Sequence, residues 1–171
     1  IVESLRPQPQ DLYHLPNGEN VVSIRGDYVR LVHLRSVFDV ADAITDPAQG
    51  LVVLVDTEDR GRIGLVIDEL LGQQQVVIKS LEENYDQIEG ISAATILGNG
   101  RVALILDVDG LARMRPTAGN PNLVAGSASL ALAAFAALLA RRPPARRHTY
   151  GCGRVETLAA RDNVLFMVLV V

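Results

Sequence analysis

Residues 64–81, GLVIDELLGQQQVVIKSL, restrict the possible folds of this chain more than any other segment. Val, Ile and Leu gather in two short runs, 64–67 and 75–79, with Leu70-Leu71-Gly72-Gln73 between them. Short runs rich in β-branched residues and interrupted by glycine are typical of strands rather than helices. The segment therefore predicts two β-strands joined by a short Leu-Leu-Gly-Gln connection.

Three further pairs of apolar runs are each separated by turn residues. They are 21–24 and 28–34 around Arg25-Gly26-Asp27, 51–55 and 63–67 around residues 58–61, and 94–97 and 102–106 around Gly98-Asn99-Gly100. Asn-Gly between apolar runs is a strong hairpin signal, because a type I′ turn needs positive φ at both central positions. Seven short strands predict small β-barrels, with short helices at 34–40 and 107–114.

The composition limits the chemistry of the chain. There is no Trp, and with one cysteine, Cys152, no internal disulfide can form, which fits a reducing cytosol. No His/Cys cluster has zinc spacing and no P-loop is present, so we expect no metal, no cofactor and no catalytic site. The acidic excess of residues 1–116 argues against nucleic-acid binding.

Two motifs resemble a known family. The run at 64–81 and the sequence GISAATILGNGRVALILDV at 90–108 are similar to the CheW-like regulatory domain at the C-terminal end of the chemotaxis histidine kinase CheA. The resemblance covers about residues 1–115. The Gln-Gln-Gln-Val-Val-Ile-Lys run at 73–79 favours the kinase domain over a free-standing CheW adaptor, which remains the alternative.

The resemblance implies a mainly β fold of two small side-by-side β-barrels of SH3-like type. The first strands would precede Ile1, so we expect the first barrel to be incomplete by about two strands, with open edges that need a partner. It also implies a scaffold and signal-coupling role without enzymatic activity in this chain. The partners would be a CheW adaptor, the cytoplasmic tips of chemoreceptors and the rest of a CheA histidine autokinase dimer, in the cytoplasm at membrane-bound receptor arrays.

Nine residues are candidates for protein interaction. They are Arg25, Gly26, Leu34, Arg35, Phe38, Gln73, Gln74, Gln75 and Lys79. The Arg25-Gly26 turn and Leu34-Arg35 match motif positions of the family. Each candidate also has a structural interpretation: turn geometry for Gly26, a solvated charge for Arg35, core packing for Phe38, a solvated strand edge for the glutamines and an ion pair for Lys79.

Residues 116–171 depart from the family. Pro116 to Pro121 is typical of a linker, and residues 123–141 form a candidate helix rich in Ala and Leu. This segment could be a surface helix or disordered, an amphipathic helix at a membrane, or a membrane span. A membrane-tethered binding protein is therefore a second alternative for the function. We nevertheless expect no direct membrane insertion. Residues 164–171 predict a strand, and we hypothesise that it fills the vacancy in the first barrel by edge addition.

Overall fold

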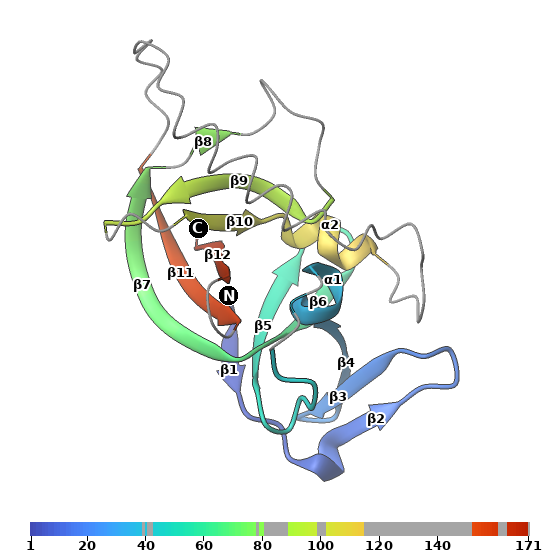
Figure 1. Cartoon of the computed structure of the whole chain (residues 1–171). Coiled ribbons are helices and arrows are strands. Elements are labelled where there is room, and N and C mark those ends of the chain that lie inside the picture. Colours follow the sequence, from blue (N-terminus) through green and yellow to red (C-terminus); the bar gives the residue numbers. More distant parts are fainter. Residues whose placement is uncertain are drawn as a thin grey trace, which may run out of the picture.

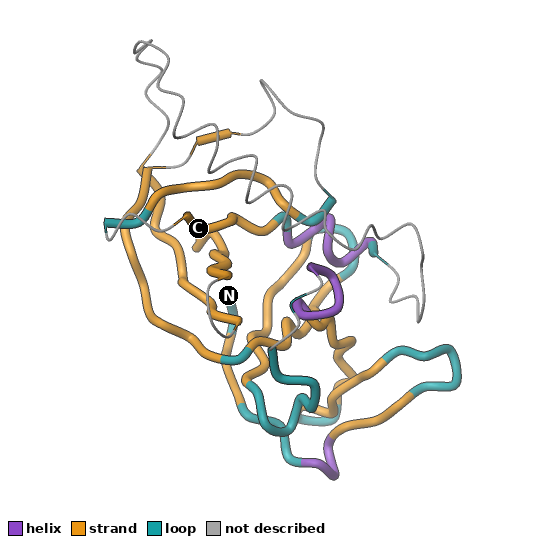
Figure 2. The backbone as a smooth tube through the Cα atoms, viewed as in Figure 1, coloured by secondary structure: helices purple, strands orange, loops and turns teal. Residues whose placement is uncertain are grey.

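The computed structural model describes residues 1–38, 40, 43–77, 79–80, 89–98, 102–114, 152–160 and 164–170, and these residues form a mainly β fold (Figures 1 and 2). The candidate helix at 123–141 and the centre of the Asn-Gly turn lie outside this part of the chain. The elements of the N-terminal half are β1 (Glu3–Leu5), the 3-10 helix η1 (Pro9–Asp11), β2 (Leu12–His14), β3 (Asn20–Ile24), β4 (Asp27–His33), α1 (Leu34–Phe38), β5 (Leu51–Thr57) and β6 (Gly61–Ile67). They are followed by β7 (Glu69–Val77), β8 (Lys79–Ser80), β9 (Ile91–Ile96), β10 (Val102–Leu106), α2 (Val108–Arg113), β11 (Cys152–Ala160) and β12 (Val164–Val170).

The first six strands form one sheet, which we call sheet A, in the order β1-β5-β6-β4-β3-β2. Its two predicted hairpins are confirmed, because β3 pairs antiparallel with β4 and β5 pairs antiparallel with β6. The β3–β4 turn has positive φ at both Arg25 (53°) and Gly26 (93°), as a type I′ turn requires. The sequence indicated this conformation only for the glycine, and the non-glycine Arg25 adopts it too.

The remaining strands form sheet B, in the order β7-β11-β12-β10-β9-β8, which curls into a half-barrel (Figure 1). The predicted Leu-Leu-Gly-Gln connection is wrong, because these residues lie inside the long strand β7. Opposite β11, the register shifts so that Thr157 faces Gly72 and Leu158 faces Leu70. Leu71 is therefore the extra residue of a β-bulge, and Gly72 beside it has a φ of 109°.

The C-terminal strand is present at Val164–Val170, but it is not added at an edge. It pairs antiparallel with β11 and parallel with β10, and β11 pairs with β7. The hairpin of β11 and β12 thus occupies the middle of sheet B. The predicted addition of one strand at a sheet edge is wrong. The unpaired edges of β7 and β10 face each other across the place that β11 and β12 occupy, and both edges need a partner strand.

The core alternates between the two faces of sheet A, as the period of a strand predicts. Val32 and Leu34 belong to the larger apolar cluster, whereas Val29 and Leu31 belong to a smaller one on the other face. The larger cluster also contains residues of β9, β10 and α2, including Leu104. It therefore packs the two sheets against each other.

Candidate functional site

The helix α2 lies where the two sheets meet, because it follows β10 of sheet B and contacts sheet A at both ends. At its N-terminus the carboxylate of Asp107 accepts a hydrogen bond from the backbone N–H of Gly110 at 2.9 Å, which caps the helix. In the first turn of α2, Asp109 Oδ1 accepts a hydrogen bond from the backbone N–H of Glu58 at 3.0 Å. Arg113 lies 3.7 Å from a carboxylate oxygen of Asp59. The β5–β6 turn is thus held against α2.

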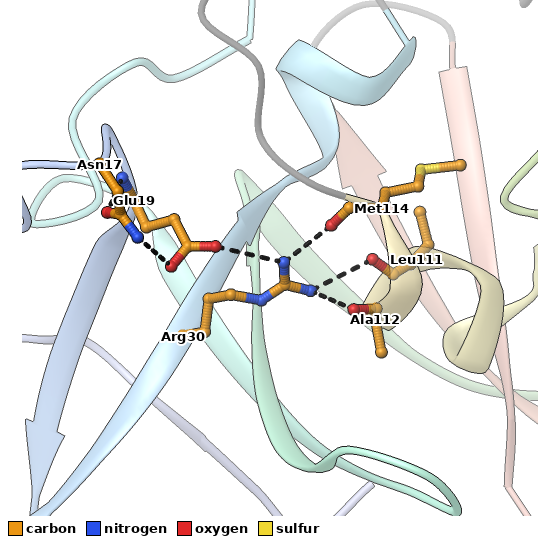
Figure 3. Close-up of polar contacts among 6 residues, drawn as sticks. All are labelled: Asn17, Glu19, Arg30, Leu111, Ala112 and Met114. Atoms are coloured by element: carbon orange, nitrogen blue, oxygen red, sulfur yellow. Dashed lines mark hydrogen bonds and ion pairs between the residues drawn. The ribbon is translucent and has the colours of Figure 1, made fainter.

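At the other end of α2, Arg30 of β4 caps the free carbonyl groups (Figure 3). Its guanidinium donates to Met114 O at 2.7 Å, to Ala112 O at 2.6 Å and, more weakly, to Leu111 O at 3.4 Å. The last carbonyls of a helix have no intrahelical partner and carry partial negative charge. A cationic donor there supplies the missing hydrogen bonds and interacts favourably with that charge. We call Arg30 and these three carbonyls the Arg30 clamp.

The Arg30 clamp is connected to the loop before β3. Glu19 Oε1 lies 3.8 Å from Arg30 Nη1, and Asn17 orients Glu19 by donating to its other carboxylate oxygen at 2.9 Å. Burial lowers the pKa of Arg30 and the nearby Glu19 opposes that shift, so the guanidinium remains charged at neutral pH. The clamp therefore joins the β2–β3 loop, strand β4 and α2 into one rigid junction between the sheets.

Arg30 was not among the residues singled out from the sequence, so this role was missed. A signal was present, because Arg30 alternates with Val32 and Leu34, both of which are buried. An arginine on an inward face must find hydrogen-bond acceptors, since buried charges are rarely tolerated without partners. The identity of those acceptors, more than 80 residues away in the sequence, could not be read from spacing.

The predicted Arg25-Gly26 turn lies at an exposed end of sheet A. Arg25 is 80% exposed and contacts Glu3 of β1 at 3.1 Å. Nearby in sheet A, the rings of Tyr13 and Tyr28 form an edge-to-face pair with centroids 5.5 Å apart, and both are exposed. The sequence did not single out these tyrosines, because an isolated exposed aromatic has no periodic signal.

The candidates in α1 are less accessible. Leu34 and Phe38 are 1% and 7% exposed and belong to the larger core cluster, which favours the packing interpretation for Phe38. Arg35 is partly buried and donates to Val40 O at 3.3 Å and to Thr45 Oγ1 at 2.7 Å. These bonds fix the chain after α1, so Arg35 is more than a freely solvated charge.

The remaining candidates lie in sheet B. Gln73 is exposed on β7, with Gln74 and Gln75 next to it, and their backbones face residues 154–156 of β11. Lys79 is in β8, opposite Ala94. The side chains of Gln74, Gln75 and Lys79 are outside the described part of the structure. The predicted residues are therefore spread over three places, the β3–β4 turn, α1 and the β7–β8 edge, rather than gathered in one site.

The described residues contain no group of three or more His, Cys, Asp or Glu side chains that could hold a metal ion. None of the described helices is both long enough and apolar enough to cross a bilayer.

Comparison with known proteins agrees with this fold. Residues 1–115 match the CheW-like domain family, and the chain belongs to that family. Among characterised relatives, it is 52% identical over 111 residues to the chemotaxis protein CheA of Klebsiella aerogenes, covering 65% of this chain and 17% of the relative. CheA of Salmonella typhimurium is also 52% identical over 111 residues, covering 65% and 16%.

More distant relatives show the same pattern. The sensor histidine kinase CheAY of Helicobacter pylori is 32% identical over 114 residues, covering 67% of this chain and 14% of the relative. The chain thus spans less than a fifth of the length of these relatives. The resemblance to the CheA regulatory domain is confirmed. Separately, residues 123–171 match the cation efflux transmembrane domain family.

Proposed function

We propose that this chain is a scaffold and signal-coupling module of a CheA-type chemotaxis kinase. It docks a CheW adaptor and the cytoplasmic tips of chemoreceptors, and passes receptor state to kinase domains elsewhere in the kinase dimer. The observation that carries the proposal is the 52% identity to two CheA proteins over 111 residues of the CheW-like domain.

Coupling requires that a docking event on one sheet change the energy of the other. The Arg30 clamp and the Asp109 and Arg113 contacts fix α2 to sheet A, while α2 continues directly from β10 of sheet B. A displacement of either sheet is therefore resisted by the junction and transmitted through it. Individually weak contacts suffice in an array, because each bound partner raises the effective concentration of the next.

For the docking surface we propose the Arg25-Gly26 turn with the Tyr13–Tyr28 pair, and the exposed Gln73 edge as a second contact. Arginine and tyrosine carry a large share of binding energy in protein interfaces, because each combines apolar area with a polar group. Gly26 with φ of 93° keeps the turn tight, and it presents Arg25 at the tip. Leu34 and Phe38 would act indirectly, by holding α1 in place.

The test is calorimetric titration of the full chain with a CheW adaptor from the same source. Arg25→Glu is expected to weaken binding about fivefold or more, as loss of an interfacial arginine costs more than ~1 kcal/mol. The matched control is Arg62→Glu, which removes another exposed arginine, paired with Asp56 at 3.1 Å, from strand β6 of the same sheet. Circular dichroism of each variant reports folding.

Two outcomes would contradict the proposal. A folded chain that does not bind the adaptor would remove the coupling role. Equal weakening by Arg25→Glu and Arg62→Glu would leave the role but remove the Arg25-Gly26 turn as the docking surface, because a general charge effect explains equal losses.

A second candidate, membrane association through the C-terminal segment, is favoured by the match of residues 123–171 to a transmembrane domain family. Insertion of 152–170 into a bilayer would remove β11 and β12 from sheet B, so the backbone of β7 would lose its partner. We expect hydrogen exchange of β7 to accelerate when lipid vesicles are added if this candidate holds. Unchanged protection of β7 with no co-sedimentation would refute it.

A further inference from the structure

In sheet B, the strands before residue 115 leave a gap between β7 and β10, and the C-terminal strands β11 and β12 fill it. Among the described strands, β7 pairs only with β11, and β10 pairs with β9 on one side and β12 on the other. Without β11 and β12, one edge of β7 and one edge of β10 would face each other across a space two strands wide. We call this space the hairpin slot.

The backbone of the hairpin slot specifies what fits into it. One strand must run antiparallel to β7, where β11 makes eight register pairs interrupted by the bulge at Leu71. The next must run parallel to β10, where β12 pairs Leu165 with Ala103 and Met167 with Ile105. A single extended strand would leave one of the two edges unpaired, which is unfavourable because strand edges carry free donors and acceptors. The slot therefore accepts a β-hairpin.

Nothing in this pairing requires the hairpin to belong to the same chain. Residues 115–151 alone connect it to α2, and at about 3.3 Å per residue they can reach a neighbouring molecule. A second copy offers the same length, direction and bulge position, so its hairpin satisfies the same edges. Exchange of an identical element between protomers is a low-cost route to a symmetric dimer.

We propose that the hairpin slot is an interaction site for residues 152–170 of a second copy of this chain, so that two copies exchange hairpins. Covalent attachment gives the chain's own hairpin an effective concentration of about 1 mM. The exchanged dimer therefore forms where chains are crowded to that level, and the self-filled form dominates in dilute solution. This inference does not depend on the proposed kinase partners.

The single cysteine makes the exchange measurable. Cys152 of β11 is the register partner of Val77 in β7. Residues opposite each other in an antiparallel pair have Cα atoms about 4.5–5.5 Å apart, which a disulfide can bridge. An isotope-labelled acceptor chain carries Val77→Cys and Cys152→Ser, and the donor is the unaltered chain. A disulfide from β7 of the acceptor to Cys152 of the donor then forms only if the donor's hairpin enters the acceptor's slot.

The two full-length chains are mixed, unfolded and refolded together at about 10 μM, far below the effective concentration of the tether, and at about 1 mM, which is equal to it. They are then oxidised, and crosslinked peptides are identified by mass. We expect the crosslink between chains to rise at least tenfold between the two concentrations. Gln73→Cys with Cys152→Ser is the matched control, because Gln73 is exposed on the same strand but faces Glu156, four residues from Cys152.

Three results would overturn the exchange. The first is no crosslink between chains at ~1 mM while Val77→Cys alone forms an internal disulfide, since the hairpin then stays with its own chain. The second is no internal disulfide in that variant, because β11 is then not in the slot. The third is an equal yield from Gln73→Cys, which indicates random collision. As a further check, Val155→Pro in the donor, which breaks a ladder bond of an interior strand, should abolish the crosslink, and Val155→Ile should preserve it.

Discussion

Removing the Arg30 clamp should destabilise the protein and loosen one end of α2. Arg30→Met keeps most of the apolar stem and removes all the donors. Two short bonds from a charged donor, to Met114 O and Ala112 O, contribute about 1.5 kcal/mol each, and the long bond to Leu111 adds little. The Glu19 ion pair at 3.8 Å adds about 0.5 kcal/mol at most. Ala112 is only 1% exposed, so its carbonyl is left buried without this donor, whereas water can reach the half-buried Met114, and the expected loss is about 2–3 kcal/mol.

Thermal unfolding followed by circular dichroism measures this loss. For a chain of this size, each kcal/mol shifts the midpoint by about 2–4 °C, so Arg30→Met should lower Tm by about 4–12 °C. Arg30→Lys should recover less than half of the loss, because an ammonium cannot reach two carbonyls with a fixed fork. Arg62→Met is the control, since its exposed pair with Asp56 should contribute less than about 1 kcal/mol.

A local measurement separates the clamp from a general packing defect. The amide of Met114 donates to Gly110 O at 3.1 Å in the last turn of α2. In Arg30→Met, hydrogen exchange of this amide should accelerate by more than the decrease in the free energy of global unfolding accounts for. The reasoning is refuted if Tm falls by less than about 2 °C, or if Arg30→Lys is as stable as the original chain.

Three other predictions concern single groups. Asp107→Ala should cost about 1 kcal/mol of unfolding free energy in urea titration, because it removes the N-cap of α2, and no measurable loss would contradict that role. Gly64→Ala should cost about 1–3 kcal/mol, since its Cβ would lie 2.8 Å from Leu31 Cδ2 and Val52 Cγ1, and an unchanged urea midpoint would show that the strands can separate without cost. Burial and then Arg35 lower the pKa of His33, so the folded protein resists protonation of this side chain. Its unfolding free energy should be constant above about pH 6.5 and decrease as the pH falls below it, whereas His33→Gln should lose that part of the slope in urea titrations across pH 5–8.

Much of the secondary structure was predictable from local patterns. The runs at 21–24 and 28–34 fold as a hairpin because Arg25-Gly26 adopts a tight turn and alternate residues face opposite clusters. Residues 69–73 show the limit of such patterns. Leu70 and Leu71 before a glycine read as a connection, yet pairing with β11 extends β7 through them as a bulged strand. The partner strand is more than 80 residues away, so local sequence carried no information about it.

The candidate site likewise has one part that the sequence predicts and one part that only the fold determines. The exposure of the Arg25-Gly26 turn follows from its sequence, since a two-residue turn with positive φ projects from a sheet. The Arg30 clamp and the Tyr13–Tyr28 pair do not, because their members come from separate strands and are brought together by the order of strands in sheet A.

The sequence by itself determined that this chain is mainly β, that its core is aliphatic and that it belongs with CheW-like domains, since strand period, turn chemistry and motif are all local properties. Only the tertiary structure decided which strands became neighbours. Backbone edges accept any strand of suitable direction and register, so the position of β11 and β12 between β7 and β10 was settled by which free edges remained to be paired.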